Sequence, residues 1–159
     1  MVRQNRIDWK ALLVILVVTY GLPFLLSLPA MGGMQNYTQL QKPPLSPPAW
    51  LFGVAWTVLY FLMGIAAYLV WKTGDLDRTK ALKAYFLQLA ANAVWTPIYF
   101  GLELRLLAFI WLLLLIALVV LTLIRFYPIR KTAAFLLLPY LAWLVFAAYL
   151  NFGTWLLNG

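Results

Sequence analysis

Five long apolar segments, separated by polar connections, dominate the pattern of the chain. Each is continuously hydrophobic over about 20 residues, the length that a helix needs to cross the hydrocarbon core of a bilayer. Strands of a membrane barrel would alternate apolar and polar positions and would be about half as long. The pattern therefore predicts an all-α membrane protein, a bundle of five transmembrane helices in a single domain over residues 1–159. We place the spans at about 10–29, 49–71, 84–102, 106–126 and 132–157.

The connection between the first two segments, residues 30–48, is the longest and is rich in proline. Prolines fix φ, lack a backbone donor and bias the preceding residue toward extended conformations. Long loops in otherwise compact domains are usually functional. We therefore expect a lid of defined shape, without regular secondary structure, over a cavity. The expected lid residues are Lys42, Pro43, Pro44, Pro47 and Pro48.

Composition restricts the class of protein further. Hydrophobic residues make up 65% of the chain, charged residues make up 10%, and the mean hydropathy is +0.90, which together indicate an integral membrane protein. There is no Cys or His, and the only acids are Asp8, Asp75, Asp77 and Glu103. Thiolate and imidazole ligation of zinc, copper or haem iron is therefore excluded, as are Cys-His and Ser-His nucleophiles. We expect no metal site and no cofactor.

The net charge of +8 is distributed unevenly over the connections. Ten of the 12 Lys and Arg residues lie before the first segment, between the second and third, and between the fourth and fifth, whereas Lys42 and Arg105 lie on the opposite side. By the positive-inside rule the N-terminus is cytoplasmic, and the lid and C-terminus are exoplasmic. Because the bases are scattered between apolar segments, we expect lipid headgroups as their contacts and no nucleic-acid partner.

The third segment carries polar and aromatic residues on one helical face. Gln88, Asn92, Trp95 and Tyr99 recur at positions i, i+4, i+7 and i+11. Amides buried in hydrocarbon need hydrogen-bond partners. This face therefore either joins helices inside the bundle or lines a cavity that holds a polar group of a ligand, and the pattern leaves both interpretations open.

The fifth segment repeats this arrangement. Trp143, Ala147, Leu150 and Asn151 share a face on which large and small residues alternate. A tryptophan beside an alanine leaves space that suits a flat apolar ligand or a neighbouring helix. Tyr140 either donates a hydrogen bond into the cavity or fills the gap at a proline kink.

The second segment begins directly after the lid and carries Trp50, Trp56 and Tyr60. Trp56 and Tyr60, one helical turn apart, are candidates for the cavity, with helix packing as an equal alternative. Small residues on the same segment, including Gly53 and Gly64, permit close helix approach or a dimer seam.

Taken together, these motifs resemble one family, the translocator proteins, also called tryptophan-rich sensory proteins (TspO/MBR). The resemblance rests on Q-K-P-P-L-S-P-P-A-W at the lid, Q-L-A-A-N-A-V-W-T-P-I-Y-F-G in the third segment and P-Y-L-A-W-L-V-F-A-A-Y-L-N in the fifth. It implies a bacterial-type member, a homodimer in a bacterial cell membrane. It also implies a pocket below the lid for tetrapyrroles such as protoporphyrin IX and for sterol-like or benzodiazepine-like compounds. Carried over by matching position, the pocket residues are Trp50, Trp56, Gln88, Asn92, Trp95, Phe100, Tyr140, Trp143, Ala147 and Leu150.

The chain departs from the family pattern at several positions. Asn36 and Leu45 stand where the family usually has Trp, and Phe152 and Leu156 stand where the cholesterol-recognition pattern needs other residues. Some family members are proposed to degrade porphyrin in light with a lid tryptophan and a fifth-helix tryptophan, of which this chain retains only Trp143. Because the cholesterol-recognition pattern near the C-terminus is incomplete in this chain, sterol binding through that pattern is not expected.

We accordingly expect a membrane protein that binds porphyrins and other flat apolar ligands and acts in tetrapyrrole sensing or transport. The alternative is an enzyme that degrades porphyrin with light and oxygen, with Trp143 as its catalytic residue. The predicted pocket contains no general acid or base, which disfavours hydrolytic or proton-transfer chemistry. The spans also lack acids for a proton relay, so that a transporter would offer only passive passage.

Overall fold

The computed structural model describes residues 6–159, and every regular element in that range is a helix. The chain follows the order α1 (Trp9–Ser27), η2 (Leu28–Ala30), α2 (Met31–Tyr37), α3 (Ala49–Lys72), α4 (Arg78–Thr96), η3 (Pro97–Gly101), α5 (Arg105–Phe126), α6 (Lys131–Leu136) and α7 (Leu138–Asn158).

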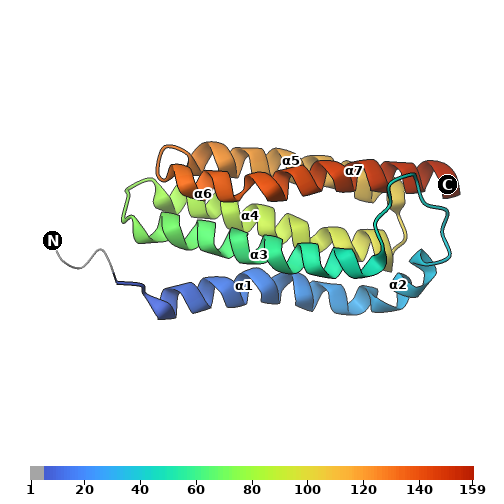
Figure 1. Ribbon diagram of the computed structural model, residues 1–159, viewed down its shortest axis with the longest axis horizontal. Helices are drawn as coiled ribbons and strands as arrows, with labels where there is room; N and C mark the ends of the chain where they lie inside the picture. Colours follow the sequence, from blue (N-terminus) through green and yellow to red (C-terminus); the bar gives the residue numbers. More distant parts are fainter. Residues whose placement is uncertain (1–5) are drawn as a thin grey trace.

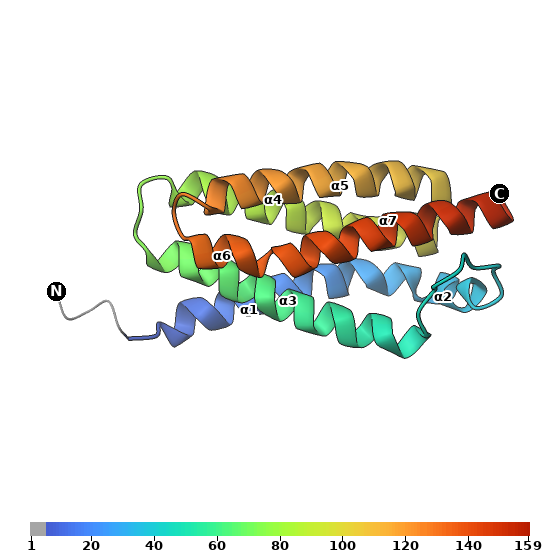
Figure 2. The same ribbon diagram turned by 45° about the horizontal axis from the view of Figure 1, so that its top comes forward.

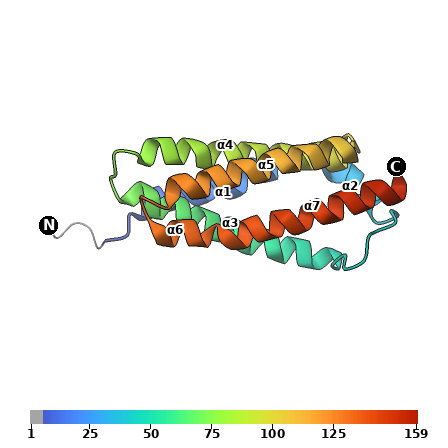
Figure 3. The ribbon, with the colours of Figure 1, turned by 90° about the horizontal axis from the view of Figure 1, so that it is seen from above.

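The long helices run side by side along the longest axis of the molecule (Figure 1). The C-terminus lies at the same end as α2, the loop 38–48 and the turn 102–104, and we call this the lid end. The turns 73–77 and 127–130 lie at the opposite end. Seen from above, α7 lies between α3 and α5, and it packs against both (Figure 3).

Four helical stretches in the described residues are long and apolar enough to cross a membrane: Trp9–Tyr37, Ala49–Lys72, Arg105–Phe126 and Lys131–Asn158. The prediction of an all-α membrane protein is confirmed. α4 is not among these four, because it carries basic residues in its first turns and amides further along. It instead packs against α1, α3 and α5, so that most of its surface faces protein.

α1 and α3 are in close contact away from the lid end. A Cβ atom on Gly64 of α3 would overlap the side chain of Leu16 on α1, so the glycine allows this close approach. The backbone N–H of Asp8, which caps α1, donates to the Tyr68 hydroxyl of α3 at 2.8 Å. These contacts assign Gly64 to packing within the chain.

The expectation of a lid without regular secondary structure is wrong for the first part of residues 30–48. α1 continues through η2 into α2, and only residues 38–48 are irregular. The physical reason is tertiary packing: α2 lies against η3, where the lack of a side chain on Gly33 admits the backbone carbonyl of Phe100. Local glycine content favours a loop, but this contact stabilises a helix.

The predicted fifth span is also interrupted, since α6 ends at Leu136 and α7 begins at Leu138. Pro139 lies in the first turn of α7, where its missing N–H costs no intrahelical hydrogen bond. Inside a continuous helix the same proline would remove one i→i−4 hydrogen bond and its ring would crowd the preceding turn.

Candidate functional site

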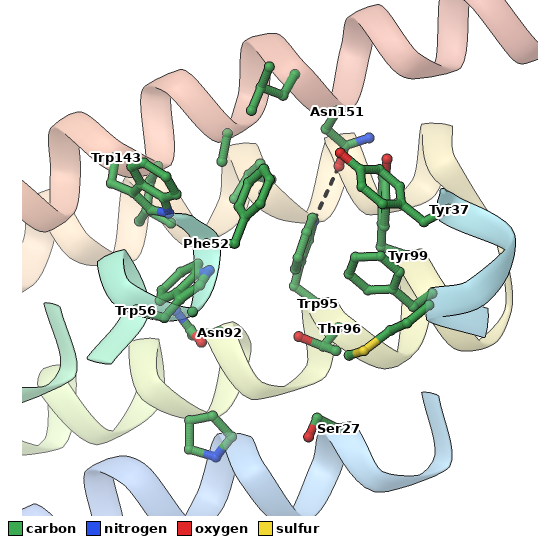
Figure 4. A pocket seen from close by; sticks show the side chains of 18 of the residues that line it. Ser27, Tyr37, Phe52, Trp56, Asn92, Trp95, Thr96, Tyr99, Trp143 and Asn151 are labelled. Atoms are coloured by element: carbon green, nitrogen blue, oxygen red, sulfur yellow. Dashed lines mark hydrogen bonds between the residues drawn. The ribbon is translucent and has the colours of Figure 1, made fainter. Parts of the chain in front are cut away.

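The lid half of the molecule contains a cavity of about 630 Å³. This volume falls within the range of about 300–1,000 Å³ typical of small-molecule sites. Side chains reach the cavity from α1, α2, α3, α4, η3, α5 and α7 (Figure 4). Ten of its 25 lining residues are aromatic, which suits the faces of flat ligands. They are Tyr20, Phe24, Tyr37, Phe52, Trp56, Tyr60, Trp95, Tyr99, Phe100 and Trp143.

Trp95 and Tyr99 form one wall of the cavity. Their rings stack with centroids 5.0 Å apart and an interplanar angle of 19°. The Trp95 indole N–H donates to the side-chain oxygen of Asn151 on α7 at 3.2 Å (Figure 4). The amide nitrogen of Asn151 in turn donates to the backbone carbonyl of Arg105 at 2.9 Å. The wall is thus fixed by hydrogen bonds that join α4, α7 and the start of α5.

The π-helical turn η3 brings a further aromatic residue to the same wall. The N–H of Leu102 donates to the carbonyl of Pro97 at 2.9 Å, which closes a turn wider than that of an α-helix. In this turn, Tyr99 stacks on Trp95 of α4. The next residue, Phe100, lies edge-on to Tyr37 of α2, with ring centroids 5.5 Å apart. Such turns occur frequently at functional sites.

Trp56 and Trp143 form the opposite wall. Trp56 stacks on Tyr60 at 5.3 Å, and its ring lies perpendicular to Trp143, with an angle of 86° and centroids 6.5 Å apart. Phe52 also lies edge-on to Trp143, with ring centroids 5.8 Å apart. The two tryptophans therefore form a corner that is rigid because both rings are packed on further aromatic side chains.

A chain of hydrogen bonds leads from the cavity into the core. The Tyr60 hydroxyl donates to Oδ1 of Asn92 at 2.8 Å, and Nδ2 of Asn92 donates to the Tyr140 hydroxyl at 2.8 Å. Tyr140 donates onward to Oε1 of Gln88 at 2.9 Å. Tyr60 and Asn92 line the cavity, whereas Tyr140 and Gln88 lie buried behind them. The polar face of α4 therefore has both of the roles considered above. Gln88 and Asn92 join α4 to α7 through Tyr140, and Asn92 also lines the cavity.

Few polar hydrogens of the cavity are available to a ligand. The hydroxyls of Ser27 and Thr57 donate to backbone carbonyls one turn back in their own helices. Among the cavity tryptophans, only Trp95 donates its indole N–H to a protein acceptor within residues 6–159. Within the described residues, the indole N–H groups of Trp56 and Trp143 and the hydroxyls of Tyr37 and Thr96 have no hydrogen-bonded protein partner.

The structure brings seven of the ten predicted pocket residues to this cavity. Three do not line it. The Trp50 side chain is 68% exposed at the lid end of α3, and Gln88 and Tyr140 lie one hydrogen bond behind Asn92. The seven that line it are Trp56, Asn92, Trp95, Phe100, Trp143, Ala147 and Leu150.

The proline segment covers the lid end without lining the cavity, since Lys42, Pro43, Pro44, Pro47 and Pro48 are all absent from its wall. The helical part of the loop lines it instead, through Met34, Tyr37 and the adjoining Thr38.

Pro43 is the buried member of the proline segment. It packs against α7 at Gly153, where a Cβ atom would lie 2.7 Å from the proline ring.

Asn36 and Leu45, the two lid positions that differ from the usual family residues, have distinct surroundings. Nδ2 of Asn36 donates to a carboxylate oxygen of Glu103 at 2.8 Å and ties α2 to the turn after η3. Leu45 is exposed and has φ of 69°, in the left-handed region. The Lys42 ammonium lies 4.7 Å from the centroid of the Tyr37 ring, which places one positive charge near the lid end of the cavity.

The contribution of α1 is absent from the sequence-based prediction. Tyr20, Pro23, Phe24 and Ser27 all line the cavity. Their spacing of i, i+3, i+4 and i+7 marks one helical face, and together with Thr19 and Gly21 they interrupt a mainly aliphatic stretch. That interruption of the aliphatic pattern is the signal that could have identified them.

Within residues 6–159, no group of three His, Cys, Asp or Glu side chains is arranged to hold a metal ion. Asn92, Asn151 and the hydroxyl-bearing residues supply the polar part of the cavity wall, and none of the lining residues in the described part of the chain carries a formal charge. The site is therefore suited to noncovalent binding of a largely apolar molecule.

Fold and site together define an integral membrane protein of helices with an aromatic cavity at one end. The sequence profile of the TspO/MBR family matches residues 11–156. The chain belongs to this family, whose members are called translocator proteins or tryptophan-rich sensory proteins.

Named relatives come from all three domains of life. The chain is 43% identical over 122 residues to the tryptophan-rich protein TspO of Archaeoglobus fulgidus, covering 77% of this chain and 79% of the relative. It is 42% identical over 126 residues to the human translocator protein, and the match covers 77% of this chain and 75% of the relative. It is 39% identical over 123 residues to the tryptophan-rich sensory protein of Cereibacter sphaeroides, covering 77% and 76%.

Proposed function

We propose that the protein binds a porphyrin or a related flat tetrapyrrole in the cavity and acts in tetrapyrrole sensing or transport. The aromatic cavity carries this proposal, because its stacked and perpendicular rings offer extended apolar faces at fixed positions. Other flat apolar molecules, including sterol-like and benzodiazepine-like compounds, fit the same chemistry. The ligand-contact residues in this proposal include Trp56, Trp95 and Trp143.

Charge at the lid end supports a ligand that carries carboxylates. Lys42 lies over Tyr37, a lining residue, and the described residues that line the cavity include no Asp or Glu that would repel an anion. A porphyrin with its propionates toward Lys42 would keep its charged groups near the lid while its ring occupies the aromatic interior.

The proposed membrane arrangement has five spans in a single domain, with α4 as the fifth span enclosed by the other helices. α4 has 19 residues, and its basic residues lie in the first turns, where their side chains can extend to the headgroups. The charge asymmetry orients the lid end outward and the N-terminus toward the cytoplasm. We propose a homodimer in a bacterial cell membrane. Gly64 packs against Leu16 within the chain and is therefore not part of the dimer seam.

Trp143 supports the second candidate function, oxidation of bound porphyrin with light and oxygen. Its indole lies at the corner of the cavity beside Trp56, within reach of a ligand that fills the space. Trp143→Phe separates the two functions. A binding protein keeps an aromatic face and most of its affinity, whereas an enzyme loses turnover disproportionately.

The test is a titration of the purified protein with protoporphyrin IX, followed by tryptophan quenching in the dark and by the porphyrin spectrum in light. Saturable quenching with no protein-dependent bleaching supports binding, and conversion to a new absorbing species supports the enzyme. We expect Trp95→Ala to weaken binding by about tenfold or more, a loss of about 1.4 kcal/mol or more, because the ligand loses one aromatic contact together with the apolar area that the contact buries. Ala147→Leu should weaken it by filling the cavity.

The matched control is Trp9→Ala, which removes an exposed tryptophan at the end away from the lid. Its affinity should equal that of the unmodified protein. Unchanged affinity in both cavity variants would place the porphyrin elsewhere.

A further inference from the structure

The cavity opens sideways, toward the space that the bilayer occupies. Ala49, Gly53 and Thr57 lie one turn apart along α3, line the cavity and are also exposed on the outer surface of the molecule. Residues that meet both the cavity and the exterior mark the rim of an opening. A Cβ atom added at Gly53 would have no atom of residues 6–159 within 4 Å, so the space beside this glycine is open in the described part of the chain.

The facing rim of this opening belongs to α1 and α2. Phe24 lines the cavity with its side chain 62% exposed, and Met34 on α2 is likewise both lining and exposed. Figure 2 shows α3 diverging from α1 toward the lid end, in contrast to the close contact at Gly64. The opening therefore lies between α1 and α3, in the part of the bundle next to the lid.

The lower limit of the opening is a contact between the two helices. The Tyr20 hydroxyl of α1 donates to the backbone carbonyl of Thr57, and the Tyr20 ring meets Tyr60 edge-on at 5.7 Å. From Ala49 to Thr57 the opening extends for about 12 Å along α3, at 1.5 Å per residue. In a hydrocarbon core of about 30 Å, that distance corresponds to much of one leaflet.

In contrast to the open side between α1 and α3, the loop 38–48 is held against α7 by several contacts. The Tyr149 hydroxyl donates to the carbonyl of Pro44 at 2.7 Å. Asn158 near the C-terminus exchanges two hydrogen bonds with the backbone of Gln41, at 3.0 and 2.8 Å. Release of a ligand through the lid would break these polar contacts together with the packing of Pro43 on Gly153.

We propose that the ligand enters and leaves the cavity sideways, from the lipid of the outer leaflet, through the opening between α1 and α3. This inference rests on the proposed function, since it assumes a ligand that partitions into membranes. A flat apolar molecule is concentrated in the bilayer and meets the opening already desolvated. The proline segment then serves as a fixed cover of the lid end and not as the entrance.

The experiment uses the absence of native cysteine. Gly53→Cys is reconstituted in phosphatidylcholine vesicles and treated with benzyl methanethiosulfonate, which places an aromatic group in the opening after folding. The rates of protoporphyrin IX association and dissociation are measured by stopped-flow tryptophan quenching before and after treatment. We expect both rates to fall by about tenfold or more, within the one to three decades by which association rates vary among related variants. Reduction with dithiothreitol should restore them.

The matched control is Val54→Cys, whose residue is 52% exposed on the same helix but does not line the cavity. Its treatment should leave both rates unchanged. If the added group only disturbed contacts between Gly53 and the bound porphyrin, dissociation would become faster. If the group obstructs the route, association and dissociation both become slower.

A second arm holds the lid closed. Gln41→Cys and Asn158→Cys are combined and bridged with a short bifunctional methanethiosulfonate, and we expect the porphyrin rates to persist. Slowing by this bridge, or unchanged rates after treatment of Gly53→Cys, overturns the lateral route. Absence of saturable quenching in every form, including the unmodified protein, overturns the proposed function instead.

Discussion

Asn92 uses both ends of its side-chain amide to hold the cavity together. Its oxygen accepts from Tyr60 and its nitrogen donates to Tyr140, which donates onward to Gln88. The amide nitrogen of Gln88 is buried and has no hydrogen-bond partner among residues 6–159, so this network already contains one unsatisfied donor there. Unpaired polar groups are costly in a buried environment. Removal of the Tyr140 hydroxyl, which bonds to both Asn92 and Gln88, should therefore destabilise the network most.

Tyr140→Phe should lower the free energy of unfolding by about 1–2 kcal/mol, because Asn92 and Gln88 each lose a hydrogen-bond partner. The measurement is titration of the micelle-solubilised protein with sodium dodecyl sulfate, followed by helical circular dichroism. Tyr127→Phe is the control, since Tyr127 is exposed and its hydroxyl has no protein partner within the described residues. Equal losses in the two variants would show that the network contributes nothing specific.

At the scale of elements, the lid end depends on how α2 packs against η3. The π-helical turn presents the carbonyl of Phe100 toward α2, and only a glycine at position 33 leaves room for it. Asn36 and Glu103 add a hydrogen bond between the same two regions. Since Tyr37 and Phe100 both line the cavity, this contact determines the shape of the site.

Gly33→Ala should destabilise the protein by about 1–3 kcal/mol, the usual cost of inserting a group into a packed contact. It should also weaken porphyrin binding, because α2 must move away from Phe100. The control is Gly32→Ala in the same helix, where an added Cβ would have no atom of the described residues within 4 Å. There we expect a gain of about 0.5–1 kcal/mol from helix propensity. Detergent unfolding and porphyrin quenching of both variants provide the comparison, and equal behaviour would contradict the role of this contact.

At the scale of the whole molecule, charge distinguishes the two ends. Lys72, Arg78, Arg125 and Lys131 lie in or beside the turns at the end away from the lid. Arg78 also donates to the carbonyl of Trp71 at 2.7 Å, which satisfies a helix terminus with a basic side chain. In the proposed topology, these basic residues would face the anionic lipids of the cytoplasmic leaflet.

Cysteine labelling in intact cells tests the orientation. Leu45→Cys in the lid and Leu76→Cys in the turn between α3 and α4 place thiols at side chains that are 82% and 98% exposed. With the lid outward, a membrane-impermeant maleimide should modify Leu45→Cys directly and Leu76→Cys only after permeabilisation. The reverse pattern would invert the proposed topology.

Much of the site could be predicted from the sequence because helical spacing is a local property. The faces that contain Asn92 with Trp95, and Trp143 with Ala147, follow from positions along one helix. The inclusion of α1 residues, the exposure of Trp50 and the position of Gln88 behind Asn92 could not be predicted. Those features depend on how separate helices are rotated and tilted against one another, and apolar helices in lipid carry little sequence signal for that.

The sequence alone determined the membrane class, the apolar segments, the charge asymmetry and the absence of metal-ligating Cys and His, because each depends on composition or on spacing within one segment. The tertiary structure decided that the first part of the loop is helical, and that the proline segment fastens to α7 instead of lining the cavity. It also decided that α1 and α3 touch at Gly64 and separate beside Gly53. The physical reason is that a close contact or an opening depends on how the side chains of two helices fit together, and the sequence of one helix does not determine that fit.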